Sequence, residues 1–368
     1  MVTGWHIVSP TLKGPVIRLP EPRYVQVSLR QPYSELQHIY SRLNVIMPTL
    51  VPLLFGTMTF GFEGKNGVRT SSLTQCQGIL DVFFAHGQTE LDTARMYAEG
   101  TTEQILSELN LKGATIDTKV YPVKPGDHSP VNLRNTFLTS LQHLKRDKIR
   151  VLYLHAPDRS VPFEDTLREV NNLYKEGKIE IFGLSNFAAW EVAEVVGICK
   201  AKGYVLPKIY QAMYNAITRE IETELVPCCR KFGIRLVIYN PLAGGLFAGK
   251  VTSIDDQTSD GRFNPSSNMG KMYRARYLQE GYFNALELLK DVAEKHNLRL
   301  TEIALRWCQH HSILDVSDGI ILGASSAAQL KQNCEDSAKG PLSQEVVDAL
   351  DEACKIVKAH GSTPLYWR

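Results

Sequence analysis

The chain has 368 residues, of which 43% are hydrophobic and 22% charged, and 41 Lys and Arg against 39 Asp and Glu leave a formal charge of +2. This balance argues against proteins that bind nucleic acid or anionic membranes, because both need a strongly basic surface. The apolar runs are short and interrupted by Gly, Pro or charged residues, so the sequence offers no transmembrane helix. The seven cysteines form no CxxC pair and no His/Cys cluster with zinc spacing. They predict reduced thiols, no bound metal and a cytoplasmic location.

Residues 1–46 differ from the rest of the chain, because they are rich in proline and arginine, poor in acidic residues and show no clear periodicity. We predict that they form a poorly ordered extension and that residues 47–368 form one barrel domain. A mitochondrial transit segment is the alternative interpretation, since such segments are also basic and poor in acidic residues.

From residue 50 onward, short apolar runs alternate with longer amphipathic segments. The runs predicted as strands are Val51–Phe55, Glu90–Thr93, Ala114–Val120, Val151–His155, Glu180–Leu184, Ile209–Met213, Arg235–Tyr239 and Gly319–Leu322. Predicted helices between them include Ser72–Ala85, Leu133–Leu144, Phe163–Tyr174, Trp190–Lys200, Glu222–Phe232 and Ala285–Glu294. Eight strand–helix units are typical of an α/β fold of the closed (β/α)₈ type, the TIM barrel.

An open, doubly wound sheet is the competing fold, but its usual GxGxxG motif is absent after the first predicted strand. Two stretches fall outside the repeat. The first, Gly244–Tyr282, follows the seventh strand and is expected to be a long binding loop without regular structure. The second is a C-terminal tail with a helix near Gln344–Lys358.

Functional residues of such a barrel lie at the carboxyl ends of its strands. The polar residues there are Asp92, Lys119, His155, Ser185, Asn186, Gln211, Tyr239 and Asn240, and Tyr97 follows Asp92 closely enough to return over the same mouth. Taken alone, each has an ordinary structural explanation, such as a helix cap for Asp92 or a solvated strand end for Lys119. Their joint occurrence at successive strand ends favours a site.

A tyrosine beside a lysine can act as a proton donor. Moving a phenol pKa from about 10 to about 7 takes roughly 4 kcal/mol. An ammonium at about 4 Å supplies that order of energy at an effective dielectric of about 20. We therefore expect Lys119, held by Asp92, to lower the pKa of Tyr97, and His155 to donate a hydrogen bond to a carbonyl oxygen.

Several motifs resemble the aldo-keto reductase superfamily over nearly all of residues 47–368. The most specific are Leu91-Asp92-Thr93-Ala94 with Tyr97, Gly183-Leu184-Ser185-Asn186-Phe187, and the Tyr-Leu-His-Ala-Pro segment ending at Pro157. The start LLFGTMTFG, the runs Tyr239–Leu246 and Ile321–Ser326, and Arg368 are similar to the branch with the aflatoxin-aldehyde and succinic semialdehyde reductases.

The resemblance implies NADPH-dependent reduction of aldehydes or reactive dicarbonyls, with Tyr97 as the proton donor. It implies a cofactor site of Ser185, Asn186, Gln211, Tyr239, Asn240, Pro241, Leu242, Gly244, Lys250, Arg262, Ser325, Gln329 and Asn333. Substrate carboxylates would meet Arg276, Arg368 and, in the same Tyr-Arg-Ala-Arg stretch, Arg274. The chain departs from the family at Arg150, where an Asp is usual, and we expect this side chain to point outward.

The same resemblance leaves open a different function, a catalytically weak regulatory subunit that senses nicotinamide redox state, as some superfamily members do on potassium channels. A cofactor-free barrel hydrolase is disfavoured, because the sequence offers neither a metal set nor a carboxylate pair. The expected partner is a small carbonyl compound rather than nucleic acid or membrane. Homodimers are common in the branch.

Overall fold

The computed structural model describes residues 16–18, 24–26, 48–257 and 261–368. The chain divides into two units, Met1–Pro48 and Thr49–Arg368. In the first, β1 (Val16–Arg18) and β2 (Tyr24–Gln26) pair as an antiparallel sheet. The predicted lack of order in residues 1–46 falls mainly on residues outside the described ranges and stays a prediction.

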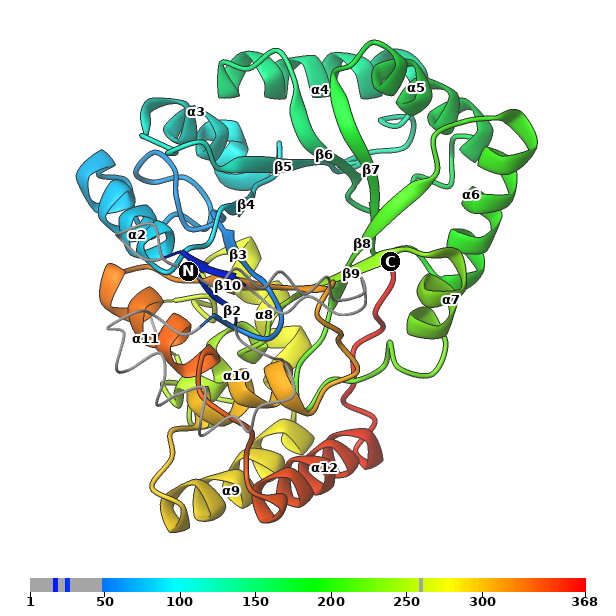
Figure 1. The fold of residues 1–368 in the computed structure, drawn as a ribbon. Coiled ribbons are helices and arrows are strands. Elements are labelled where there is room, and N and C mark those ends of the chain that lie inside the picture. Colours follow the sequence, from blue (N-terminus) through cyan, green and yellow to red (C-terminus); the bar gives the residue numbers. More distant parts are fainter. Residues whose placement is uncertain (1–15, 19–23, 27–47, 258–260) are drawn as a thin grey trace, which may run out of the picture. The chain divides into compact units, whose positions relative to one another are not determined.

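The second unit contains the predicted closed barrel of eight parallel strands (Figure 1). The strands are β3 (Leu53–Gly56), β4 (Glu90–Asp92), β5 (Thr115–Val120), β6 (Ile149–Leu154), β7 (Ile179–Ser185), β8 (Pro207–Met213), β9 (Arg235–Tyr239) and β10 (Gly319–Gly323). The barrel closes where β10 pairs with both β3 and β9. All eight predicted strands are confirmed, with bounds that differ by a few residues, and the open sheet is excluded.

Helices lie around the outside of the barrel (Figure 1). They are α2 (Leu73–Ala85), α3 (Thr101–Glu108), α4 (Pro130–Leu144), α5 (Phe163–Lys175), α6 (Ala189–Lys202), α7 (Leu225–Phe232), α9 (Glu280–Lys295), α10 (Leu300–His310), α11 (Ala327–Ser337) and α12 (Gln344–Ala359). The last of these packs against α9, and the chain then runs back to the barrel.

The stretch after β9 differs from its prediction as an unstructured loop. It contains the 3₁₀ segment η2 (Ala243–Ala248) and the helix α8 (Asn268–Tyr277). The Ser267 hydroxyl caps α8 by accepting the N–H of Gly270 at 2.9 Å. The stretch around α8 is rich in Gly, Ser, Asn and Asp, which favour a loop, yet α8 forms and Tyr273 and Tyr277 bury their rings against the core.

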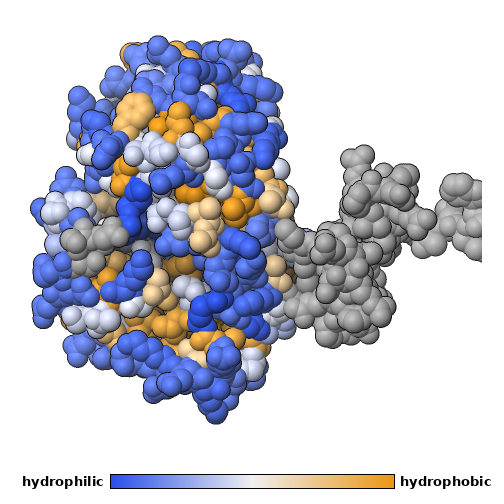
Figure 2. All heavy atoms as spheres, turned by 90° about the vertical axis from the view of Figure 1, so that its left-hand side faces the viewer, coloured by the Kyte–Doolittle hydropathy of each residue, from blue (hydrophilic) through white to orange (hydrophobic). Residues whose placement is uncertain are grey.

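Two hydrophobic cores hold the fold. A small one fills the barrel interior and comprises Leu54, Val151, Tyr153, Ile209, Val237 and Ile321. A much larger one lies between the strands and the helices. Within the described residues, no helix is long and apolar enough to cross a membrane. The face on the side of α2 and α11 is mostly hydrophilic, with separate apolar patches (Figure 2).

Arg150 does not point outward as expected. Its side chain is 15% exposed, and Nη2 lies 2.6 Å from a carboxylate oxygen of both Asp117 and Glu90. Arg235 also pairs with Glu90, at 3.0 Å. Asp117 is fully buried, and burial raises its pKa to about 7 against the opposing charge of Arg150. Arg150 turns toward these carboxylates because a buried anion without a counter-ion is costly.

Candidate active site

A buried ion pair joins the ends of β4 and β5. Lys119 is fully buried, and its ammonium donates to Asp92 Oδ2 at 2.7 Å and to the carbonyl of Thr93 at 2.8 Å. The other Asp92 oxygen, Oδ1, accepts from Nε2 of Gln211 at 2.7 Å. Both carboxylate oxygens therefore have charged or polar donors, as a buried carboxylate requires.

Tyr97 begins the 3₁₀ segment η1 (Tyr97–Gly100), which returns over the mouth of the barrel. This turn is tight, with φ of 47° at Ala98 and 91° at Gly100. The positive φ at Gly100 favours glycine, and a Cβ there would also lie 1.2 Å from Nη2 of Arg95. Arg95 in turn pairs with the buried Glu103, and this contact fixes the turn.

The turn brings the Tyr97 hydroxyl to 3.4 Å from Lys119 Nζ, which donates to it. The ring of His155 meets Tyr97 edge-on, with centroids 6.0 Å apart. Nδ1 of His155 is buried and, among the residues that the structure describes, has no hydrogen-bond partner. Burial and the positive charge of Lys119 hold the pKa of His155 well below its usual range. The imidazole is therefore neutral at physiological pH and keeps one N–H to donate.

The expected lowering of the Tyr97 pKa is not what this arrangement gives. Burial and the negative charge of Asp92 instead raise the pKa of Tyr97 well above its usual value. Burial is the larger cause, and the ammonium does not offset it, because Lys119 Nζ is closer to Asp92, at 2.7 Å, than to Tyr97, at 3.4 Å. Its charge is largely compensated by the carboxylate, so the phenol retains its proton.

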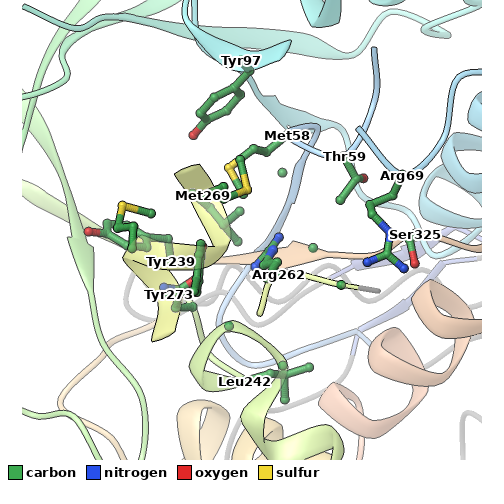
Figure 3. Close-up of a pocket in the computed structure, with 18 of the residues that line it drawn as sticks. Met58, Thr59, Arg69, Tyr97, Tyr239, Leu242, Arg262, Met269, Tyr273 and Ser325 are labelled. Carbon is green, nitrogen blue, oxygen red and sulfur yellow. The ribbon is translucent and has the colours of Figure 1, made fainter. Parts of the chain in front are cut away.

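A pocket of about 480 Å³ opens at this end of the barrel. It runs from Tyr97 and Tyr239, past Arg262, to Arg69 and Ser325 (Figure 3). Of the residues predicted from the sequence, those that line it are Asp92, Tyr97, His155, Asn186, Gln211, Tyr239, Asn240, Pro241, Leu242, Gly244, Lys250, Arg262, Arg276, Ser325, Gln329 and Arg368. The structure thus brings residues from distant parts of the chain into one elongated pocket.

Four predicted residues do not line the pocket. Lys119 lies behind Asp92, and Ser185 is fully buried and accepts from Nδ2 of Asn186 at 3.1 Å. Asn333 lies further along α11. Arg274, expected at the mouth, instead donates to the carbonyls of Asp256 at 2.6 Å and Ile254 at 2.9 Å. It holds the long loop together rather than facing a substrate.

The pocket also contains residues that sequence reasoning missed, among them Met58, Thr59, Arg69 and Tyr121. Tyr121 directly follows β5, so the rule that selected the other strand-end residues could have found it. Arg69 lies in the loop after β3, where no periodicity or motif distinguishes it. The hydroxyl of Thr59 donates to the carbonyl of Ala324 at 2.8 Å, which ties this loop to the end of β10.

The shape and donors of the pocket fit a dinucleotide. At one end, Asn186, Gln211 and the ring of Tyr239 can hold a flat amide-bearing ring. In the middle of the pocket, Gly244 lines the wall with its backbone alone, and Arg262 supplies a cation. At the other end, Ser325 and Gln329 lie at the N-terminus of α11, where helices favour phosphate.

Comparison with known proteins identifies the chain. A model of the aldo/keto reductase family matches residues 52–355. The human protein named aldo-keto reductase family 7 member A3 is 43% identical over 300 residues, which cover 78% of this chain and 90% of that protein. The chain belongs to the aldo/keto reductase family. It is therefore an oxidoreductase of a family that acts on small carbonyl compounds and generally uses nicotinamide cofactors.

Other relatives support the predicted branch. The aflatoxin B1 aldehyde reductase member 2 of Mus musculus is 41% identical over 329 residues, or 86% of this chain and 87% of the relative. The aldo-keto reductase pigE of Monascus ruber is 36% identical over 328 residues, or 84% of this chain and 96% of that protein. The family match and the relatives named aflatoxin B1 aldehyde reductase support aldehyde reduction as the activity of this chain.

Proposed function

We propose that this aldo/keto reductase uses NADPH to reduce aldehydes and reactive dicarbonyl compounds to alcohols, with Tyr97 as the proton donor. The observation that carries the proposal is the position of the Tyr97 hydroxyl, which faces the pocket 3.4 Å from a buried ammonium and beside a neutral imidazole. A phenol, a cation and a neutral N–H donor at one point suit the negative charge that develops on a carbonyl oxygen.

A bound nicotinamide would supply the hydride to the carbonyl carbon. His155 donates a hydrogen bond to the carbonyl oxygen and thereby orients it. Tyr97 gives its proton to the same oxygen, which completes the alcohol. An alkoxide is a stronger base than a phenolate, so this transfer is favourable although the pKa of Tyr97 is raised. Lys119 stabilises the resulting phenolate, which then regains a proton from solvent.

The cofactor residues have distinct roles in this proposal. Asn186 and Gln211 hydrogen-bond the carboxamide, Ser185 holds the side chain of Asn186 from behind, and the Tyr239 ring stacks on the nicotinamide. The segment from Asn240 to Lys250, which includes Pro241, Leu242 and Gly244, surrounds the pyrophosphate. The group that holds the 2′-phosphate comprises Arg262, Ser325 and Gln329, whereas Asn333, predicted with them, lies outside the pocket. The hydroxyl and N–H of Ser325 now bind Gln329 Oε1, both at 3.0 Å, and are the donors a phosphate would take.

The substrate side of the pocket carries two arginines, Arg276 and Arg368. We propose that they bind the carboxylate of an anionic aldehyde. The guanidinium of Arg276 lies over the rings of Tyr273 and Tyr277, at 5.6 and 6.0 Å. This stacking holds the planar group in one orientation, which favours two-pronged binding of a carboxylate.

Substitution of Tyr97 by phenylalanine tests the proposal. We expect Tyr97→Phe to lose reduction of 2-carboxybenzaldehyde by at least a hundredfold, while NADPH binding, followed by its fluorescence, persists. Tyr174→Phe is the matched control, because Tyr174 is 43% exposed on α5. Equal turnover by the Tyr97 variant and the parent would remove Tyr97 from its role. Tight NADPH binding with negligible turnover across a panel of aldehydes would favour the regulatory subunit, and tighter binding of NADH than of NADPH would contradict the phosphate site.

We also propose a cytoplasmic location, on the basis of the unpaired cysteines, and a homodimer, on the basis of the branch that the chain resembles. Cell fractionation with sequencing of the mature N-terminus tests the first and distinguishes it from mitochondrial import. Light scattering of the purified protein tests the second.

A further inference from the structure

The segment after α12 ends at the pocket, although residues 362–368 form no helix or strand. In Figure 1 this tail runs from α12 back to the barrel near β8 and β9. Its position must therefore depend on side-chain and main-chain contacts rather than on secondary structure. Three successive residues, Tyr366, Trp367 and Arg368, make these contacts.

Tyr366 is the deepest anchor of the tail and is only 7% exposed. Its hydroxyl donates to Oε2 of Glu224 at 2.8 Å and accepts the N–H of Ala189 at 3.1 Å. Ala189 is the first residue of α6, and Glu224 immediately precedes α7. One hydroxyl thus ties the tail to the beginnings of two barrel helices.

Trp367 makes a second contact. The guanidinium of Arg159 lies over its ring at 5.6 Å. Arg159 is itself fixed, because its Nε donates to Oε1 of the buried Glu191 at 2.7 Å. The other oxygen of Glu191 accepts the N–H of Ala188 at 2.8 Å and so caps α6. Trp367 therefore rests on a cation that is bound to the same helix start as Tyr366.

These anchors determine where Arg368 lies. Its N–H donates to the carbonyl of Asn186 at 3.1 Å, and its guanidinium reaches the sulfur of Met272 at 3.3 Å. A thioether is a weak acceptor. In the described part of the chain Arg368 forms no ion pair with a carboxylate, so its guanidinium retains strong donors that face the pocket.

We propose that Tyr366 is a positioning residue for substrate recognition: its bond to Glu224, with the stacking of Trp367 on Arg159, holds Arg368 ready for the carboxylate of an aldehyde substrate. This inference rests on the proposed function, because it assumes that Arg368 meets the anionic group. A tail held in advance loses less conformational freedom when substrate binds, so the anchor strengthens binding without taking part in the chemistry.

Steady-state kinetics on a matched pair of substrates test this role. Tyr366→Phe keeps the ring but removes the hydroxyl bonded to a carboxylate. We expect its KM for 2-carboxybenzaldehyde to rise about tenfold, the usual order for one hydrogen bond to a charged group. KM for benzaldehyde and kcat for both substrates should stay within about twofold of the parent, as they should in the control Tyr174→Phe.

A double-mutant cycle separates this role from a general structural one. If Tyr366 acts through Arg368, Tyr366→Phe should add nothing to the KM of an Arg368→Gln variant. An equal rise in KM for both substrates, or a tenfold effect that persists in the Arg368→Gln background, would overturn the proposal.

A binding measurement distinguishes failure of this inference from failure of the proposed function. By calorimetry, benzoate should bind the parent more tightly than benzamide does, and Tyr366→Phe should weaken benzoate about tenfold while leaving benzamide unchanged. This result would support the anchor even if no aldehyde were reduced. Benzoate binding that is equal in the Tyr366→Phe variant and the parent would refute the anchor even if Tyr97 proves essential for turnover.

Discussion

Replacing Gly183 by alanine tests how closely the barrel interior is packed beneath the candidate site. Gly183 on β7 is the register partner of Tyr153 on β6. An alanine Cβ would lie 2.5 Å from Cδ1 and 2.7 Å from Cε1 of Tyr153, and 2.9 Å from Cγ2 of Ile209. Carbon atoms pack at about 3.5–4 Å, so the tyrosine ring would have to move by about 1 Å.

Little room is available for that movement. Tyr153 is fully buried, and its ring centroid lies 5.8 Å from the ammonium of Lys119 on another side. Overpacking of this kind costs about 1–3 kcal/mol. Since the new methyl is blocked by two neighbours, we expect Gly183→Ala to lose about 3 kcal/mol of unfolding free energy, at the upper end of that range.

Urea unfolding followed by circular dichroism measures the change, and Gly197→Ala is the matched control. Gly197 lies within α6, and a Cβ there meets no atom within 4 Å. Alanine favours a helix over glycine by about 1 kcal/mol, so this variant should be more stable than the parent. Tyr153→Leu should recover part of the loss in the Gly183→Ala background. If Gly183→Ala unfolds at the same urea concentration as the parent, the reasoning about close packing is wrong.

Three further predictions concern charge and backbone geometry. Arg150→Met should lower the unfolding free energy by about 3 kcal/mol at pH 8 and by less at pH 5.5. Asp117, whose folded pKa is raised to about 7, is largely protonated at pH 5.5 and then needs no counter-ion. Equal losses of unfolding free energy at pH 5.5 and pH 8 would contradict this reasoning. Burial and Lys119 lower the pKa of His155 well below 6.5, so the pH profile of kcat should show no step from this imidazole between pH 6 and 7. An inflection in that range that disappears in His155→Gln would show that the imidazole does titrate there. Gly100→Ala should lower both the thermal midpoint of unfolding and kcat, because residue 100 has a φ of 91° and the new methyl would lie 1.2 Å from a guanidinium nitrogen of Arg95. An unchanged thermal midpoint and kcat would mean that the turn tolerates a side chain.

The strands were predictable because helices cover them on one side and the barrel core on the other, which leaves nearly continuous apolar runs. Their carboxyl ends then placed Asp92, Lys119 and His155 together without further information. Features that depend on three-dimensional distances were not predictable. The pKa of Tyr97 follows from how deeply its ring is buried and from how close Asp92 lies, and a sequence contains neither quantity.

Two other differences have the same kind of cause. Arg150 was expected to point outward, but it turns toward the buried carboxylates of Asp117 and Glu90, which come from other strands. The helix α8 forms within a stretch rich in Gly, Ser, Asn and Asp, because Arg274 binds loop carbonyls and two tyrosines pack inward. In both cases long-range contacts outweigh the local pattern.

The carboxylate of Asp92 has a consequence for how the amide of Gln211 is oriented. Since Nε2 of Gln211 points at Oδ1 of Asp92, the amide oxygen faces the other way and is left as an acceptor. A carboxamide placed beside it must then present its own NH₂ group, which allows only one of the two rotations of that group. Asp92, which binds Lys119, thus also determines, through Gln211, the orientation that a ring carboxamide can adopt in this barrel.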